Sequence, residues 1–262
     1  MMIARLLDDW KAVYRYREFL KNTVAKDLRT RYKGSILGFL WTFVSPLLML
    51  VVYSTLFSVI IRMPVDHYPI FLFCTLLSWN YFSSAVQSSS SIIVASGNLI
   101  KKIYFPLEIL PISVVTGGLI NYLYGLIILI PALVLYGYYP NIHYLWLPVI
   151  IAIQFVFTLA LAFLFSALTV FFRDLEHILS IVLMAWLYLT PVLYPVSLIP
   201  EEYQYLFGLN PMSVIINSYR DIFYYNQAPD SSLLVFGILA VGLLVLSHAY
   251  FSKVKFRFVE EI

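Results

Sequence analysis

Residues 144–172 read YLWLPVIIAIQFVFTLALAFLFSALTVFF, an uncharged and mostly apolar run that decides the fold class. A helix needs about 20 consecutive apolar residues to cross a bilayer, and this run is longer. Other stretches without Asp, Glu, Lys or Arg lie at residues 36–61, 68–95, 109–136, 178–199 and 231–247. The last of them reaches spanning length if its helix continues to about Phe251. We therefore predict an all-α integral membrane protein with six transmembrane helices.

The composition of the whole chain agrees with this class. Of the 262 residues, 61% are hydrophobic and 12% are charged, whereas soluble domains are about 45–50% apolar and about 25% charged. A soluble globule of this size could not hide so much apolar side chain, so lipid must be the solvent. The single cysteine, Cys74, cannot form an internal disulfide, and we interpret it as a packing residue.

A basic segment precedes the first apolar run. It holds nine Lys or Arg residues between Arg5 and Lys33. Apolar side chains recur in it at helical spacing, which predicts an amphipathic helix lying in the headgroup plane: Ile3, Leu6, Leu7, Trp10, Val13, Tyr14 and Leu20. We expect no cleaved signal peptide, because the first apolar run exceeds the signal-peptide core of about 7–15 residues. The chain then divides into an interface segment, 1–33, and a six-helix transmembrane domain, 34–262.

The basic residues also predict the orientation in the membrane. With the amino terminus inside, fifteen of the 17 Lys and Arg residues fall in inner segments, and Arg62 and Arg220 remain for the outer loops. Basic residues concentrate on the cytoplasmic side of membrane proteins. Both termini are therefore expected in the cytoplasm.

The outer segment 196–230 is too short and too charged at Arg220 and Asp221 to cross the membrane. Asn210 can cap a helix that has Pro211 at its first position, and apolar residues continue the pattern. We predict two short re-entrant helices, half-buried in the outer leaflet, before the last span.

The six stretches carry no ionisable Asp, Glu, Lys or Arg, although carriers driven by protons or sodium usually keep such a group in the membrane. The chain also lacks a Gly-rich phosphate loop followed by Lys and Ser or Thr, so active transport would need energy from another subunit. A self-contained carrier or channel remains an alternative, because backbone carbonyls alone can bind sodium. A membrane enzyme acting on lipid-linked sugars is another, but acidic residues on the outer face are scattered. His177 has no His or Cys neighbours in the sequence, so no metal site is predicted.

Polar and aromatic side chains interrupt the spans in a pattern with two interpretations. Ser83, Ser84, Gln87 and residues 88–91 form a polar stripe in the second stretch. The stripe either makes hydrogen bonds between helices or lines a wet pore. Trp and Tyr also fall near mid-span, where they either pack or offer ring faces to sugars.

Several short motifs resemble one family of transporters. Residues 31–41, RYKGSILGFLW, with Pro46 following, are similar to the start of the first span in ABC-2 type permeases that export polysaccharides. Residues 98–111 resemble the coupling loop of that family, although Leu107 stands where many relatives have Arg. Matching elements follow in order: Phe172-Arg173-Asp174, Thr190-Pro191 and Asn210-Pro211. O-antigen exporters are the expected nearest relatives, followed by teichoic-acid and capsule exporters.

The resemblance implies a function in lipopolysaccharide biosynthesis. The chain would be the permease of an ABC transporter in the inner membrane, a homodimer paired with two copies of an ATPase that binds ATP and Mg. It would itself need no cofactor, contact no nucleic acid, and pass a lipid-linked polysaccharide, O-antigen, outward. The implied ATPase contacts are Asn98, Lys101, Lys102, Tyr104, Phe105, Pro106, Glu108, Arg173 and Asp174. The implied outer gate comprises Asn210, Pro211, Tyr219 and Arg220. The channel-lining candidates, on the first and fifth spans, are Phe39, Phe43, Tyr53, Trp186, Tyr188 and Tyr194.

Overall fold

The structure, a computed structural model, describes residues 2–30, 34–35 and 37–262, and for residues 2–7, 30 and 39 it describes the backbone alone. Every regular element in these ranges is helical. In chain order they are α1 (Met2–Arg15), α2 (Arg17–Thr30), η1 (Gly38–Leu40), α3 (Trp41–Ser54), η2 (Thr55–Ile60), α4 (Tyr68–Ala95), α5 (Gly97–Ile100), α6 (Ile109–Leu135), η3 (Ile142–Trp146), α7 (Leu147–Phe171), α8 (Leu175–Tyr188), η4 (Val196–Leu198), α9 (Glu201–Leu209), α10 (Pro211–Arg220), η5 (Asp221–Tyr225), α11 (Ser232–Val254), η6 (Lys255–Arg257) and α12 (Phe258–Glu261).

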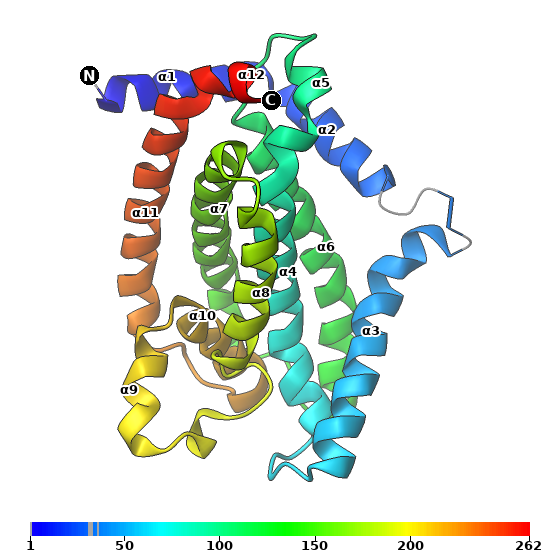
Figure 1. Ribbon diagram of the computed structural model, residues 1–262. Coiled ribbons are helices and arrows are strands. Elements are labelled where there is room, and N and C mark those ends of the chain that lie inside the picture. Colours follow the sequence, from blue (N-terminus) through cyan, green and yellow to red (C-terminus); the bar gives the residue numbers. More distant parts are fainter. Residues whose placement is uncertain (1, 31–33, 36) are drawn as a thin grey trace.

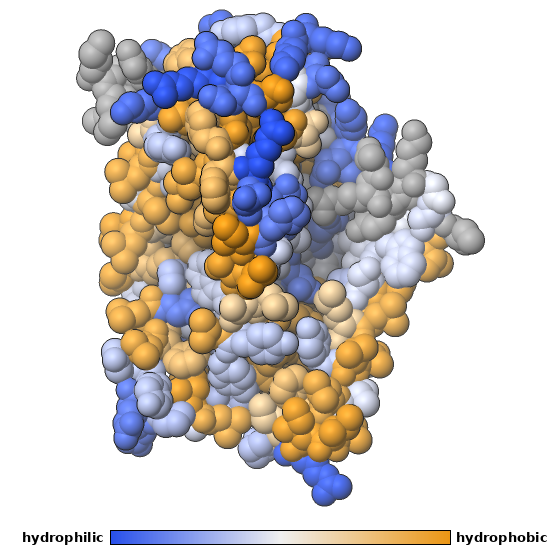
Figure 2. All heavy atoms as spheres, viewed as in Figure 1, coloured by the Kyte–Doolittle hydropathy of each residue, from blue (hydrophilic) through white to orange (hydrophobic). Residues whose placement is uncertain are grey.

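Within the described residues, five helical segments are long and apolar enough to cross a membrane. They are Trp41–Ile60, Tyr68–Ala95, Ile109–Leu135, Ile142–Phe171 and Ser232–Glu261. They run roughly side by side in Figure 1, and an apolar band covers most of the flank in Figure 2. The prediction of an all-helical membrane protein is thus confirmed.

The predicted span 178–199 is not one continuous helix. Helix α8 has 14 residues and ends at Tyr188, which gives a length of about 21 Å against a hydrocarbon core of about 30 Å. Pro191 causes the break, because proline has no N–H and disfavours helical backbone at the residue before it, Thr190. The chain then turns irregularly toward α9.

The amino-terminal segment also differs from the single helix expected. It forms two helices, α1 and α2, with a break at Tyr16. Helix α1 lies across one end of the bundle, here called the α1 end, beside α12 (Figure 1). Helix α2 packs along α6, where Gly117 leaves room for Asp27: a Cβ at Gly117 would lie 3.1 Å from Asp27 Oδ2.

Helix α4 forms the centre of the bundle and packs against α6 and α7, while α11 packs against α7. Glycines permit the close contact of α4 with α6, since a Cβ at Gly118 would meet the Tyr81 ring at 3.1 Å and one at Gly125 would meet Leu77 at 3.0 Å. Helix α3 is different. It lies at the edge of the bundle (Figure 1) and Thr42 is its one buried residue.

Candidate functional site

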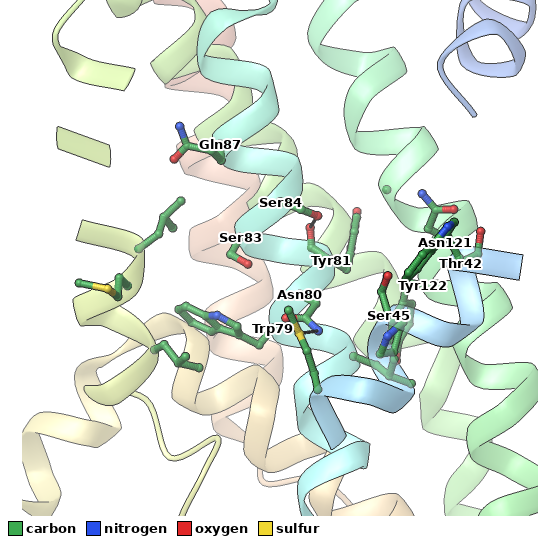
Figure 3. A pocket seen from close by; sticks show the side chains of 18 of the residues that line it. Thr42, Ser45, Trp79, Asn80, Tyr81, Ser83, Ser84, Gln87, Asn121 and Tyr122 are labelled. Carbon is green, nitrogen blue, oxygen red and sulfur yellow. Dashed lines mark hydrogen bonds between the residues drawn. The ribbon is translucent and has the colours of Figure 1, made fainter. Parts of the chain in front are cut away.

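A groove of about 550 Å³ opens between α3, α4, α6 and α8 (Figure 3). Its lining residues are Trp41, Thr42, Ser45, Pro46, Met49, Leu77, Trp79, Asn80, Tyr81, Ser83, Ser84, Gln87, Gly118, Asn121, Tyr122, Ser180, Leu183, Met184 and Leu187. More hydroxyl and amide side chains meet here than an apolar helix bundle needs for packing. The groove is therefore the candidate functional site.

Several polar atoms of this groove lack a partner. Among the described residues, Thr42 Oγ1, Gln87 Oε1 and Asn121 Oδ1 are buried and accept or donate no hydrogen bond. The amide of Asn80 donates to Met49 Sδ at 3.7 Å, a weak acceptor. An unpaired polar group in an apolar environment costs several kcal/mol in principle. Polar atoms that are not satisfied within the chain thus lie in the walls of the groove.

Aromatic rings form the remaining walls. Trp41 and Trp79 contribute from α3 and α4, and the rings of Tyr81 and Tyr122 stack at a centroid distance of 5.8 Å. The Trp41 indole donates to Ser35 Oγ at 2.8 Å, which fixes one wall. Ring faces combined with hydroxyls and amides can hold a sugar weakly in many positions.

The groove of this single chain does not test whether the predicted aromatic residues line a pathway in an assembled transporter. Trp186 packs instead against Phe82, at 5.3 Å between ring centroids, and donates to Asn210 Oδ1 at 2.8 Å. The side chain of Phe39 lies outside the described part. The other candidates do not line the groove: Phe43, Tyr53, Tyr188 and Tyr194. Their place in a pathway stays a prediction.

Part of the polar stripe of the second stretch lines the groove, and part of it is buried between helices. Ser83, Ser84 and Gln87 line the groove, whereas Ser89 and Ser90 are buried in the bundle. Sequence reasoning missed other lining residues, namely Trp41, Asn80 and Asn121. Asn80 and Asn121 could have been identified from the sequence, because each is an amide side chain inside an uncharged stretch.

The broken end of α8 is held by the residue that begins α10. Asn210 caps α10, as predicted, and accepts from the Met212 N–H at 3.1 Å, while Pro211 occupies the first turn. The Asn210 amide also donates to the Leu189 carbonyl and to Thr190 Oγ1, both at 3.0 Å. This one side chain therefore joins the start of α10 to the end of α8.

Arg220 lies in the interior and is not on an exposed outer loop. Its side chain is 2% exposed, and Nη2 donates to the carbonyls of Pro191 at 2.8 Å and Val192 at 3.1 Å. The guanidinium carbon lies 3.8 Å from the centroid of the Phe71 ring. Burial lowers the pKa of Arg220 to about 10, so the group stays charged at neutral pH. Tyr219, the other predicted gate residue of α10, is also buried.

The connection between α4 and α6, residues 96–108, is here called the α4–α6 loop. Asn98, Lys101, Lys102 and Tyr104 are exposed, Tyr104 at 91%. Three residues predicted to contact an ATPase are turned toward their own chain or partly covered: Phe105, Pro106 and Glu108. Phe105 packs against Phe19 with ring centroids 4.9 Å apart. The structure thus distinguishes exposed from covered residues of this loop, and their contacts with an ATPase stay a prediction.

A second loop, which joins α7 to α8, lies at the same end. Arg173 and Asp174 are both exposed there. Arg173 donates to the Glu261 carbonyl at 3.4 Å, a long bond that places this loop beside α12.

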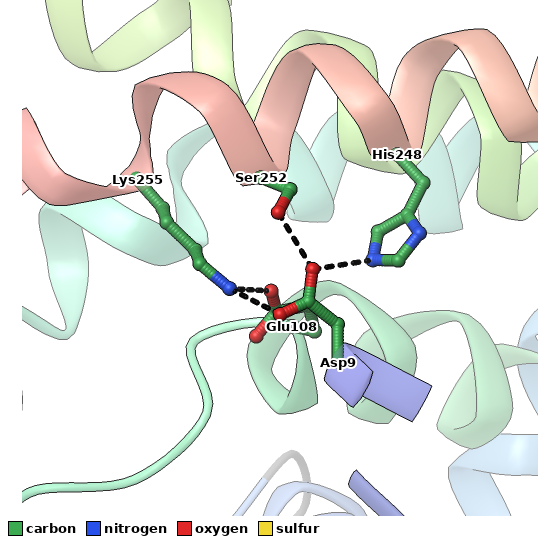
Figure 4. A network of polar contacts seen from close by, with 5 residues as sticks. All are labelled: Asp9, Glu108, His248, Ser252 and Lys255. Atoms are coloured by element: carbon green, nitrogen blue, oxygen red, sulfur yellow. Dashed lines mark hydrogen bonds and ion pairs between the residues drawn. The ribbon is translucent and has the colours of Figure 1, made fainter. Parts of the chain in front are cut away.

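An ion-pair cluster lies next to the α4–α6 loop (Figure 4). Lys255 Nζ is 2.8 Å from Asp9 Oδ1 and 2.5 Å from Glu108 Oε1. Ser252 donates to Asp9 Oδ2 at 2.6 Å, and His248 Nε2 lies 3.9 Å from the same oxygen. Asp9, Glu108 and His248 bring ligand atoms within 4.8 Å of one another. The Lys255 ammonium already supplies the positive charge in this cluster, so we interpret it as an ion-pair network.

Long apolar helices around a polar groove, with exposed basic loops at one end, are typical of a membrane-embedded transport subunit. The chain belongs to the ABC-2 type transporter family, whose family model matches residues 19–224.

Proteins with similar sequences carry names that agree with this family. The O-antigen export system permease protein RfbA of Myxococcus xanthus is 39% identical over 255 residues, 96% of this chain and 98% of that protein. The protein of the same name from Klebsiella pneumoniae is 34% identical over 236 residues, 90% and 91% of the two chains. The polysialic acid transport protein KpsM of Escherichia coli is 22% identical over 201 residues, 75% of this chain and 77% of that protein.

Proposed function

We propose that this chain is the permease subunit of an ATP-driven exporter that moves a lipid-linked polysaccharide of the O-antigen type outward across the cytoplasmic membrane. The names of the relatives support a glycan as cargo, since the proteins at 39% and 34% identity are called O-antigen export permeases. The protein at 22% identity is named for another glycan, polysialic acid.

The observation that carries the proposal is the groove between α3, α4, α6 and α8. A polysaccharide presents many hydroxyl groups, so its pathway needs hydrogen-bonding groups of moderate strength. Thr42, Gln87 and Asn121 line the groove with hydroxyl and amide side chains, and tryptophan and tyrosine rings offer faces for weak stacking. A strong binding site would trap the chain, and an aliphatic wall would leave its hydroxyls unsatisfied.

The orientation proposed has the α1 end in the cytoplasm. Positive charge gathers at that end, as expected from the distribution of basic residues along the chain. Helix α8 and the irregular residues 189–195 together make the fifth of six crossings. Helices α9 and α10 then lie in the outer leaflet without crossing it, and act as a gate.

The complex proposed contains two copies of this chain and two of a separate ATPase, which binds ATP and Mg. Helices α3 and α8 flank the groove and expose apolar side chains such as Val52 and Ile181. A second copy packed there would close two grooves into one pathway. The exposed part of the α4–α6 loop, with Arg173 and Asp174 nearby, would receive the ATPase.

The test is transport by the purified complex. The chain, co-expressed with an ABC ATPase that co-purifies with it, is reconstituted in vesicles with a fluorescently labelled lipid-linked glycan, and native mass spectrometry counts the subunits. We expect ATP-dependent transport by a complex with two copies of each, and a loss of about tenfold or more for Asn121→Leu. Ser88→Ala is the matched control, because Ser88 is exposed on α4 outside the groove. Transport without ATP, or an Asn121→Leu complex as active as the control, would contradict the proposal.

A further inference from the structure

Three segments far apart in the sequence meet in the ion-pair cluster of Figure 4. Asp9 comes from α1, Glu108 directly precedes α6, and Lys255 follows α11. We propose that Lys255 is a positioning residue for energy coupling, because it locks the α4–α6 loop to α1 and α11. The inference rests on the proposed function and assigns a residue outside the loop to the same machinery.

Burial makes this cluster a firm attachment. The side chains of Lys255, Asp9 and Glu108 are 16%, 17% and 1% exposed, so water screens their charges weakly. Lys255 Nζ lies between two carboxylates and is the ammonium group that pairs with both. Without it, Asp9 would keep the Ser252 hydroxyl and the nearby His248 ring, whereas Glu108 would lose the ion pair that the structure gives it. Loss of one partner from a buried ion pair is strongly destabilising, since the remaining charge stays buried. Without Lys255, the end of the loop that carries Glu108 would lose its ionic attachment to α1.

The other end of the loop is held by the same carboxyl-terminal segment. Gly97, at the start of α5, packs so closely against Ile262 that a Cβ there would overlap the isoleucine side chain. Residues 255–262 therefore fix both ends of the loop, while Lys101, Lys102 and Tyr104 between them stay exposed. A displacement of these exposed residues by the ATPase would therefore be transmitted to α11 and α1 through Lys255, as well as to α4 and α6 along the chain.

The chain offers a matched control two residues away. Lys253 is exposed in the last turn of α11, whereas the Lys255 side chain is 16% exposed and paired within the cluster. Replacement of either lysine by glutamine changes the net charge equally. A difference between the two variants therefore reports the cluster and not the total charge.

The first measurement needs no transport. Trypsin cuts after exposed lysines, so the cleavage rate at Lys101 and Lys102 reports how firmly the loop is held. In nanodiscs, Lys255→Gln should be cleaved about tenfold faster than Lys253→Gln, because the freed loop opens more often. Lys255→Arg should restore the slow rate. Equal rates for the two glutamine variants would overturn the proposal.

The second measurement is the amount of glycan exported per ATP hydrolysed by the reconstituted complex. Lys255→Gln should keep the ATPase bound and hydrolysing while the export-to-hydrolysis ratio falls about tenfold, and Lys255→Arg should recover the ratio. A ratio equal to that of Lys253→Gln would overturn the coupling role. If the unmodified complex exports no glycan, the proposed function fails, and the proteolysis result still decides whether Lys255 holds the loop.

A second variant covers the case in which Lys255→Gln does not fold. Lys255→Gln combined with Glu108→Gln also removes the Glu108 carboxylate, one of the two that Lys255 pairs with. This double variant should therefore fold, insert into the membrane and be purified. Its loop should still be cleaved faster than that of Lys253→Gln, because the ionic attachment is gone. A cleavage rate equal to that of the control would contradict the inference.

Discussion

Replacement of Arg220 by methionine should destabilise the chain more than replacement of any exposed arginine. In the folded chain Arg220 Nη2 donates to the carbonyls of Pro191 and Val192, two acceptors that the break after α8 leaves without helical partners. Methionine would fill similar space but donate nothing. The Val192 carbonyl would keep the Thr75 hydroxyl at 3.2 Å, whereas the Pro191 carbonyl would lose its side-chain donor.

The magnitude follows from these contacts. An unsatisfied buried carbonyl costs about 1–3 kcal/mol, and loss of the guanidinium over the Phe71 ring costs about 0.5–2 kcal/mol. The substitution also removes a buried charged group whose Nε has no hydrogen-bond partner, and this stabilising effect offsets part of the loss. We expect a net loss of about 2–4 kcal/mol, and a fall in melting temperature of about 5–10 °C.

The lone cysteine provides the assay. Cys74 is 0% exposed, so a thiol-reactive fluorogenic dye should report unfolding of the purified chain in detergent. Arg257→Met, at an exposed site near the carboxyl terminus, serves as the control. Phe71→Leu in combination with Arg220→Met forms a double-mutant cycle that isolates the ring contact. An Arg220→Met protein that melts within about 1 °C of the control would refute the stabilising role of the Arg220 contacts.

Three further results are expected. Thr42→Val should raise the melting temperature slightly, because it removes an unpaired buried hydroxyl, yet it should slow glycan export; a destabilised protein would show that Thr42 is satisfied. Gly118→Ala should lower the melting temperature relative to Gly242→Ala, since a Cβ would meet Tyr81 at 3.1 Å in the first case and nothing within 4 Å in the second. Tyr104→Ala should weaken co-purification of the ATPase without changing the melting temperature, because this side chain is 91% exposed; undiminished co-purification would remove Tyr104 from the contact.

The helical membrane fold could be predicted because lipid imposes a simple rule on sequence: long uncharged runs must be helices. The break in the fifth run was also accessible in principle, since Thr190-Pro191 lies inside it. Proline is tolerated in some membrane helices, such as α6 with Pro131, so its effect at residue 191 depended on neighbours that the sequence does not identify.

The candidate site was predicted only in part. The polar stripe at Ser83 and Gln87 marked one wall of the groove, because polar residues in a membrane helix need a partner. Lys255 and Asp9 lie 246 positions apart, and no local pattern connects them. The distribution of basic residues assigns Arg220 to an outer segment but does not predict how deeply its side chain is buried. In the structure it is buried because backbone carbonyls freed at the end of α8 give it acceptors.

The small contact between α3 and the rest of its own chain has a consequence for the subunit before it is assembled. A helix with a single buried residue gains little from its own subunit. In the proposed dimer, this helix would stay loosely tethered after insertion into the bilayer until the second copy docks against it. Chains that find no second copy would display that helix to the quality-control proteases of the membrane. Cellular abundance would then follow the rate of pairing, and the cell would accumulate complete transporters in preference to orphan subunits.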